Sequence, residues 1–172
     1  CCKRLIKNRK AINMRKSGIL LAISSIPSKY GIGSFSKEAY EFVDFLEKAG
    51  QSLWQILPLG PTGYGDSPYQ SFSTFAGNPY YIDLEEFITK GYLTKEECDN
   101  SDLGDGEFVD YEKIFHAKFK LLKKAFLKSN LEENRDYQEF IEKNEGWLDD
   151  YALFMALKDS FGGISWIEWD ND

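Results

Sequence analysis

The residues SGILLAISSIPSKYGIGSFSKEAYEFVDFLEKAGQSLWQILPLG, at positions 17–60, decide the fold. They begin with a short apolar run at 17–24, which is typical of a buried strand flanked by loops, and end with another strand-like run at 53–59. Between them, residues 36–49 have the apolar spacing of a helix. A strand, a helix and a strand within about forty residues form one βαβ unit, which implies a parallel sheet covered by helices.

The middle segment has one apolar face and a signal at each end. Four apolar residues recur at i, i+3, i+4 and i+7, namely Ala39, Phe42, Val43 and Leu46. Ser36 is placed to cap the start of the helix, and Gly50 is placed to end it. In the second apolar run, Pro58 marks the edge of a strand, because proline has no amide hydrogen to give to a sheet.

A long loop, GPTGYGDSPYQSFSTFAGNP at 60–79, follows the second strand, and loops of this length are usually functional. Its aromatic residues alternate with hydrogen-bonding ones: Tyr64, Tyr69 and Phe72 with Asp66, Ser67, Gln70 and Ser71. Flat rings beside short polar groups suit a sugar, which offers C–H faces and hydroxyls. An Ω-loop packed by its own aromatics, with Asp66 and Ser67 serving turns, explains the same composition.

The chain after this loop is helical and charged. Residues 83–86 have the form of a capping box, and Gly91 closes the short helix that follows. Residues 94–97 have the same form and open another helix.

Longer helices are indicated farther along. Between 111 and 129 an apolar stripe lies opposite lysines, and it consists of Phe115, Phe119, Leu122 and Phe126. A last pair of helices is predicted at 137–141 and 147–159, with Gly162 and Gly163 as the stop.

The composition limits the partners. The formal net charge is −7 and the pI is near 4.9, whereas nucleic-acid binding is driven by clustered Lys and Arg. We therefore expect no nucleic-acid partner. No run approaches the roughly 18 apolar residues of a membrane span, so we expect no membrane insertion. Nothing in the pattern singles out a surface for a protein partner.

The cysteines and the basic start of the chain bear on compartment. Cys1, Cys2 and Cys98 provide neither a disulfide framework nor the C-x-x-C spacing of a zinc site, which favours a reducing cytoplasm. Residues 1–16 are predicted to be a disordered or non-native leader, because they are basic, lack an apolar signal region and contain Met14 just before the first patterned segment.

Two motifs imitate nucleotide-binding loops. GIGSFS at 31–36 lies between a strand and a helix, as a dinucleotide fingerprint does. That fingerprint also needs an acidic residue at the end of the second strand, where this chain has Leu59 and Gly60, so a simple tight turn is favoured. GPTGYGDS lacks the Gly-Lys-Ser/Thr of a phosphate-binding loop.

The chain has one histidine, His116, which excludes most Ser-His-Asp, Cys-His and multi-histidine metal schemes. Its place between Phe115 and lysines indicates a solvated or half-packed helix residue, and we expect no metal. Carboxylate chemistry on a glycosidic bond needs a pair about 5 to 5.5 Å apart in retaining enzymes. Asp83 and Asp110 are placed at helix starts, which leaves Asp66 alone in the loop.

The segment WQILPLGPTGYGDSPYQSFSTFAGNPYYIDL, at 54–84, closely resembles the signature region of amylomaltase-type 4-α-glucanotransferases. The resemblance continues in GILLAISSIPSKYGIGSFSKEA before it and in VDYEKIFHAKFKLLKKAF after it. It extends to WLDDYALFMALKDSFGGISWIEW at 147–169.

This resemblance implies an α/β fold that is the N-terminal portion of a (β/α)8 TIM barrel with a largely helical inserted subdomain. Residues 17–60 would be the first βα unit and the second barrel strand, and 61–172 the glucan-binding loop and the helical insertion. The implied activity transfers a segment of an α-1,4-glucan, such as a malto-oligosaccharide, by retaining double displacement without a cofactor. The catalytic carboxylates are expected beyond Asp172.

The resemblance also assigns roles in the loop. Tyr69 looks like the aromatic that packs on the sugar at the cleavage point, and Ser67 like its hydrogen-bonding neighbour. Asp66 is expected to position the loop, and Tyr64 to be an accessory glucan contact. A complete barrel needs ~250 residues, so we expect the isolated chain to be aggregation-prone and inactive. A non-catalytic glucan-binding module is the alternative.

Overall fold

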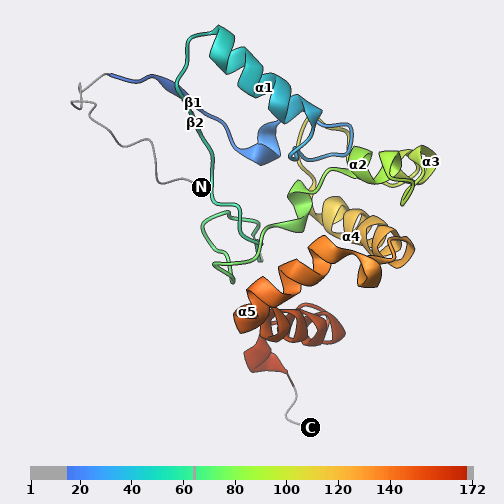
Figure 1. Ribbon diagram of the computed structural model, residues 1–172. Helices are drawn as coiled ribbons and strands as arrows, with labels where there is room; N and C mark the ends of the chain where they lie inside the picture. Colours follow the sequence, from blue (N-terminus) through green and yellow to red (C-terminus); the bar gives the residue numbers. More distant parts are fainter. Residues whose placement is uncertain (1–14, 64, 170–172) are drawn as a thin grey trace. The chain divides into compact units, whose positions relative to one another are not determined.

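The computed structural model describes residues 15–63 and 65–169 (Figure 1). The chain forms two compact units, Cys1–Lys124 and Ala125–Asp172. Its helices are α1 (Lys37–Lys48), α2 (Leu84–Thr89), α3 (Lys95–Asp99), α4 (Tyr111–Lys128) and α5 (Arg135–Ser160). Its strands are β1 (Gly18–Leu20) and β2 (Leu53–Gln55), and its 3-10 turns are η1 (Ile23–Ser25), η2 (Pro79–Tyr81), η3 (Leu131–Glu133) and η4 (Trp166–Glu168). Most of the predicted leader, residues 1–14, lies outside the described residues.

The predicted βαβ unit is confirmed. β1 and β2 pair in parallel, with Gly18 opposite Leu53 and Leu20 opposite Gln55, and α1 lies between them in the chain. The Trp54 indole N–H donates to the Leu21 carbonyl at 2.9 Å and ties the end of β1 to β2. Each strand is three residues long, shorter than predicted, because the chain after β1 turns into η1.

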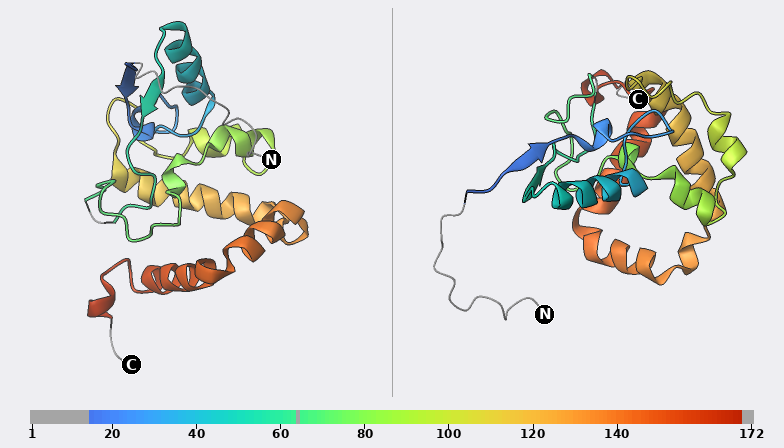
Figure 2. Two further views of the ribbon diagram at one scale, coloured as in Figure 1. Left: turned by 60° about the vertical axis from the view of Figure 1, so that its left-hand side comes forward. Right: turned by 90° about the horizontal axis from the view of Figure 1, so that it is seen from above.

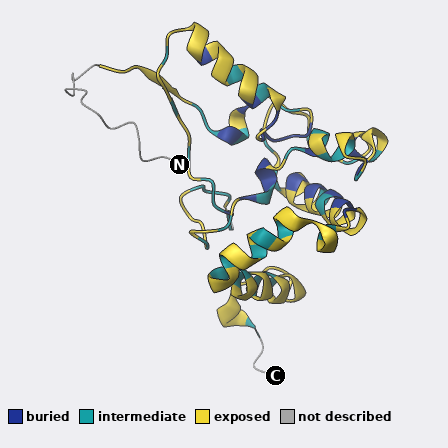
Figure 3. Ribbon diagram, in the orientation of Figure 1, coloured by how far each residue is buried: buried dark blue, intermediate teal, exposed yellow. Residues whose placement is uncertain are grey.

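The expectation that the first strand is buried is wrong for this chain. Every residue of β1 is exposed, and the side chain of Leu20 is 59% exposed (Figure 3). The helix α1 reaches the sheet through Phe42, whose ring packs edge-on against Trp54 with centroids 5.0 Å apart. Two short strands and one helix bury little apolar surface, so the sheet faces remain in contact with water.

The ends of α1 follow the prediction with one difference. Ser36 occupies the N-cap, but its hydroxyl donates to the Glu38 carboxylate at 2.6 Å instead of accepting from a backbone amide. Gly50 has φ of 70°, and its N–H and that of Gln51 bond to the carbonyls of the last turn at 2.9 Å. This closure is the Schellman motif, which needs a residue in the left-handed region.

The core of the first unit comes mainly from three segments, and its buried residues are drawn dark blue in Figure 3. The segment after β1 contributes Ile23, Ile26, Tyr30 and Ile32. The helices α2 and α3, with the turn after each, contribute Leu84, Leu93, Cys98 and Leu103. The helix α4 contributes Ile114 and Leu121. The core therefore sits beside the βαβ unit rather than beneath its sheet.

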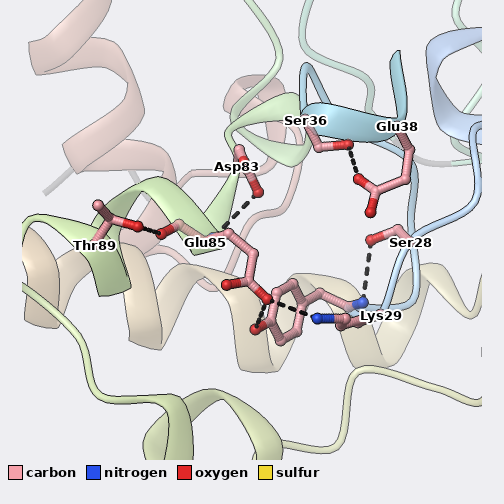
Figure 4. A network of polar contacts seen from close by, with 8 residues as sticks. Ser28, Lys29, Ser36, Glu38, Asp83, Glu85 and Thr89 are labelled. Atoms are coloured by element: carbon pink, nitrogen blue, oxygen red, sulfur yellow. Dashed lines mark hydrogen bonds and ion pairs between the residues drawn. The ribbon is translucent and has the colours of Figure 1, made fainter. Parts of the chain in front are cut away.

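A polar network ties the segment after β1 to α2 (Figure 4). The Glu85 carboxylate accepts from the Tyr30 hydroxyl at 3.0 Å and from the Lys29 ammonium at 3.2 Å. Asp83 caps α2 by accepting from the Glu85 amide at 3.1 Å. Of the two predicted capping boxes, the one from Thr94 to Glu97 is present with both bonds. At 83–86 the bond that the structure shows is the one just described, from the Glu85 amide to the Asp83 side chain.

The glycines of GIGSFS serve close backbone packing. Gly31 has φ of 72°, and a Cβ there would lie 1.6 Å from the Leu103 carbonyl oxygen. A Cβ on Gly33 would lie 2.0 Å from the Ile23 carbonyl oxygen. These contacts explain the glycine spacing without any phosphate, in agreement with the tight-turn interpretation.

The predicted apolar stripe of α4 is wrong by one position. The buried residues of its first turns are Ile114, Lys118 and Leu121, while Phe115, Phe119 and Phe126 are exposed. The buried face contains a lysine, which a hydrophobicity pattern counts as solvent-facing. The Lys118 side chain is buried because its amine donates to the Tyr80 carbonyl.

The predicted last pair of helices is one helix, α5. Gly146 lies within it, and the ribbon changes direction along its length (Figures 1 and 2). The side-chain amide of Asn144 donates to the Phe140 backbone carbonyl at 2.7 Å, and side-chain bonds of this kind can bend helices. Gly162 and Gly163 both have positive φ and end the helix as predicted. Over residues 15–63 and 65–169, no helix is long and apolar enough to cross a membrane.

Replacing Gly33 by Ala tests the close packing of this turn. We expect Gly33→Ala to lower the free energy of unfolding by about 2–3 kcal/mol, because the new Cβ overlaps backbone atoms that cannot rotate away. Gly77→Ala is the matched control, since a Cβ there meets nothing within 4 Å. Urea unfolding followed by circular dichroism measures both. Equal midpoints for the two variants would contradict the steric argument.

Candidate functional site

The predicted loop is closed at its base. The Asn78 amide donates to the Leu59 carbonyl at 2.8 Å, so the residues between them leave and return at one point after β2. An antiparallel bridge joins Thr62 to Ser71 across the loop. The two arms approach so closely at Gly60 that a Cβ there would lie 2.4 Å from the Ser71 hydroxyl. In this closure the segment matches the Ω-loop interpretation.

In the returning part of the loop, residues 71–78, serine hydroxyls form hydrogen bonds with the nearby backbone. The Ser71 hydroxyl donates to the Ser73 carbonyl at 2.7 Å. The Ser73 hydroxyl in turn accepts from the amides of Phe75 and Ala76, at 3.3 and 3.0 Å. Asn78 then caps η2 by accepting from the Tyr80 amide at 2.9 Å. Serine and asparagine in these positions replace the sheet bonds that an irregular loop lacks.

Asp66 has an uncommon backbone conformation for a residue other than glycine. Its φ is 50°, a left-handed conformation that Asp and Asn tolerate better than most residues. Its amide donates to the Gly63 carbonyl at 3.1 Å, and its carboxylate accepts from the Thr62 hydroxyl at 3.4 Å. Asp66 thus lies where a loop-positioning residue is needed.

The Asp66 carboxylate is partly desolvated and lies near two phenols. Burial raises its pKa above the ordinary value, and the Thr62 hydroxyl partly offsets that rise. Burial also raises the pKa of Tyr80 to about 12, with a further rise from the Asp66 charge. The pKa of Tyr111 is raised for the same two reasons. The carboxylate therefore belongs to the packed side of the loop.

Tyr69 lies on the open side. Its ring is 73% exposed, although it belongs to a loop with a fixed base. Ser67 is two residues before it, half-buried, and its carbonyl accepts from the Gln70 amide at 3.0 Å. An Ω-loop filled by its own aromatics would bury such a ring, so that part of the alternative does not describe Tyr69. Tyr64, the fourth predicted contact, lies outside the described residues.

The other candidates have structural places. Asp83 caps α2, and Asp110 accepts from the Lys113 amide at 3.1 Å at the start of α4. His116 is exposed on α4 beside Phe115, as predicted. In the described part of the chain no group of three His, Cys, Asp or Glu residues could hold a metal ion. These residues therefore add no reactive group to the loop.

Sequence reasoning missed Lys118, Tyr80 and Tyr111, which lie against the packed side of the loop or its exit. One signal for Lys118 was available: it follows Ile114 by four residues and precedes Leu121 by three, so it falls on one helix face with them. The two tyrosines carried no comparable signal.

The arrangement suits binding rather than bond breaking. It offers an exposed aromatic residue, Tyr69, on a loop held by its own hydrogen bonds, and the hydroxyl-bearing Ser67 lies two positions before it in the chain. Such a surface can stack on an apolar face of a ligand and bond to its hydroxyls. It places one carboxylate, Asp66, in the loop, and retaining glycosidic chemistry uses two.

Comparisons with known proteins identify close relatives. The sequence model of a family described as 4-alpha-glucanotransferase matches residues 21–172. The chain is 56% identical over 151 residues to a 4-alpha-glucanotransferase of Clostridium butyricum, covering 87% of this chain and 31% of that protein. It is 48% identical over 159 residues to one of Thermus thermophilus, covering 90% of this chain and 31% of that protein.

A solved structure is similar over the same length. The amylomaltase from Streptococcus agalactiae in complex with acarbose superposes with a TM-score of 0.84 at 44% identity. The match covers 92% of this chain and 32% of that one. The chain therefore spans about a third of the length of the relatives it matches.

Two substitutions at Asp66 separate its backbone role from its charge. We expect Asp66→Ala to lower the free energy of unfolding by about 1 kcal/mol. Alanine adopts a left-handed φ at a higher energy than aspartate does, and the variant lacks the hydrogen bond from Thr62. Asp66→Asn, the matched control, tolerates that φ and keeps an acceptor, so it should cost less than half as much. Thermal unfolding measures both. An equal loss in both variants would assign the effect to the charge instead.

Proposed function

The chain belongs to the 4-alpha-glucanotransferase family, and we propose that its loop at 60–78 binds an α-1,4-glucan during transfer of a glucan segment to a new acceptor. Malto-oligosaccharides are the substrate class. The reaction is a retaining double displacement. A carboxylate attacks the anomeric carbon and breaks the α-1,4 bond, and the released glucan segment leaves with a proton from a general acid. The acceptor hydroxyl then gives its proton to that same group and displaces the carboxylate.

The exposure of Tyr69 carries the proposal. A ring that is 73% exposed on a loop fixed at its base can meet a sugar without a rearrangement of the backbone. Aromatic rings lose little conformational entropy on binding because they have two rotatable bonds. Ser67 supplies a hydroxyl two residues away, and Asp66, which precedes Ser67, holds the backbone there with a φ of 50°.

The relatives support a carbohydrate ligand. The Streptococcus agalactiae amylomaltase, 44% identical to this chain, is in complex with acarbose, which is a carbohydrate. The family description also names glucan transfer. We extend both to this chain because its similarity to these proteins runs through the whole loop.

The proposal divides the work between this chain and residues after Asp172. Residues 17–60 supply the first strand, helix and second strand of a (β/α)8 barrel, and 61–172 supply the loop and a helical insertion. The nucleophile and the general acid come from later strands, so the 172 residues alone supply part of the glucan-binding groove and contact the glucan without catalysing its transfer. The proposal requires no cofactor. A buried, free Cys98 suits the cytoplasm as the compartment.

A non-catalytic glucan-binding module is the second candidate. The observation in its favour is that the loop is closed by bonds within this chain, from Asn78 to Leu59 and from Lys118 to Tyr80. Binding by the 172 residues alone is expected under both functions. Transfer between maltotriose molecules by a chain extended beyond Asp172 supports the enzyme, and binding without transfer by that longer chain supports the module.

Replacing Tyr69 by Ala tests the binding surface. We expect Tyr69→Ala to weaken the binding of maltoheptaose about fivefold or more, the equivalent of about 1 kcal/mol of stacking. Tyr40→Ala is the matched control, since Tyr40 is 71% exposed on α1, outside the loop. Nuclear magnetic resonance titration of the chain with maltoheptaose measures both affinities. Unchanged affinity in Tyr69→Ala, or an equal loss in Tyr40→Ala, would refute the assignment.

A further inference from the structure

Lys118 is a buried lysine on α4 whose partner is a backbone carbonyl. Its side chain is 1% exposed, which places it among the most buried large side chains of the described residues. Its amine donates to the carbonyl oxygen of Tyr80 at 2.5 Å. Burying an amine is costly unless it is hydrogen-bonded, so this contact accounts for the position of the side chain.

The carbonyl that Lys118 holds belongs to the exit of the loop. Tyr80 lies in η2, the turn that carries the chain from the loop to α2. That turn has two further anchors: the Asn78 amide bonds to Leu59 at 2.8 Å, and the Tyr81 carbonyl accepts from the Phe35 amide at 3.1 Å. The exit is therefore held from the segment after β2, from the segment before α1 and from α4.

Of these three anchors, the bond from Lys118 is made by a side chain, whereas the other two join backbone groups. Removing its amine would leave the Tyr80 carbonyl without this donor in a buried place, and a buried, unsatisfied carbonyl is destabilising. The environment also disfavours the ammonium: burial lowers the pKa of Lys118 to about 8, and the Asp83 carboxylate partly opposes that shift. A neutral amine is a weaker donor than an ammonium but still carries N–H groups, so a donor faces the Tyr80 carbonyl in both forms.

We propose that Lys118 is a positioning residue for glucan binding, which fixes the exit of the loop that presents Tyr69 by holding the Tyr80 carbonyl. Its action is indirect, because the side chain is buried and has no access to a ligand. The link to glucan binding rests on the proposed function, whereas the link to the loop's base rests on contacts within the chain alone.

Lys118→Met tests this inference with the 172-residue chain. Methionine keeps most of the volume and the unbranched shape of lysine and removes the donor. Lys123→Met is the matched control, because Lys123 is exposed on the same helix. Amide hydrogen exchange reports on the base of the loop at Asn78 and on a distant bond at Ala49, which donates to Phe45 at the end of α1.

We expect Lys118→Met to speed exchange at Asn78 about tenfold or more, the order expected for loss of a buried hydrogen bond, with Ala49 unchanged. Lys123→Met should change neither amide. Equal acceleration at Asn78 and Ala49 would mean general destabilisation and would overturn the positioning role. An unchanged rate at Asn78 would overturn it as well.

Maltoheptaose affinity separates this inference from the proposed function. If both hold, Lys118→Met weakens binding severalfold, and Lys123→Met does not. If the unsubstituted chain shows no binding while exchange at Asn78 still rises in Lys118→Met, the glucan function is refuted, but the role of Lys118 in fixing the exit of the loop is supported. If Lys118→Met does not fold, resonance titration of the Lys118 side chain in the unsubstituted chain decides: titration at the ordinary lysine value would show a solvated side chain and refute the contact.

Discussion

The arrangement of this chain depends on closure of the long loop at its base, where the Asn78 amide donates to the Leu59 carbonyl and the carbonyls of Tyr80 and Tyr81 accept from Lys118 and Phe35. This closure brings the chain back to Leu59, just after β2, before α2 begins. The core then forms from the segment after β1, from α2 and α3 with their turns, and from the first turns of α4. Without that return, the βαβ unit and the helical core would have no fixed connection through the loop.

The loop has two sides with different physical roles. On the packed side, Asp66 bends the chain and lies near buried phenols, and Lys118 satisfies the carbonyl at the exit. On the open side, the Tyr69 ring meets water. Polar groups inside and an apolar ring outside reverse the usual pattern, and that reversal is what a sugar-binding surface needs, because sugars present both C–H faces and hydroxyls.

Local signals allowed much of this to be predicted from sequence. The strand, helix and strand order, the end of α1 at Gly50 and the capping box at Thr94 all depend on neighbours within a few residues. The failures depend on distant groups. The buried face of α4 was missed because Lys118 bonds to Tyr80, which is 38 positions away. Whether β1 is buried depends on which other segments pack on the sheet, and this is not encoded within β1. The two helices predicted near Gly146 form one helix, α5, because the helix continues through this glycine. In the proposed site, composition and the family resemblance singled out Asp66, Ser67 and Tyr69, but neither indicated that Asp66 is partly buried while Tyr69 is exposed.

The closed base also has a consequence for how such a protein changes over evolution. The entropy lost on closing a loop grows only with the logarithm of its length, by about 0.6 kcal/mol for each doubling. Because both ends meet at Leu59 and Asn78, residues can be inserted or deleted between them without moving β2 or α2. Selection can therefore alter the reach and chemistry of the loop separately from the stability of the fold, so descendants of one scaffold can diverge in ligand preference while their cores stay alike.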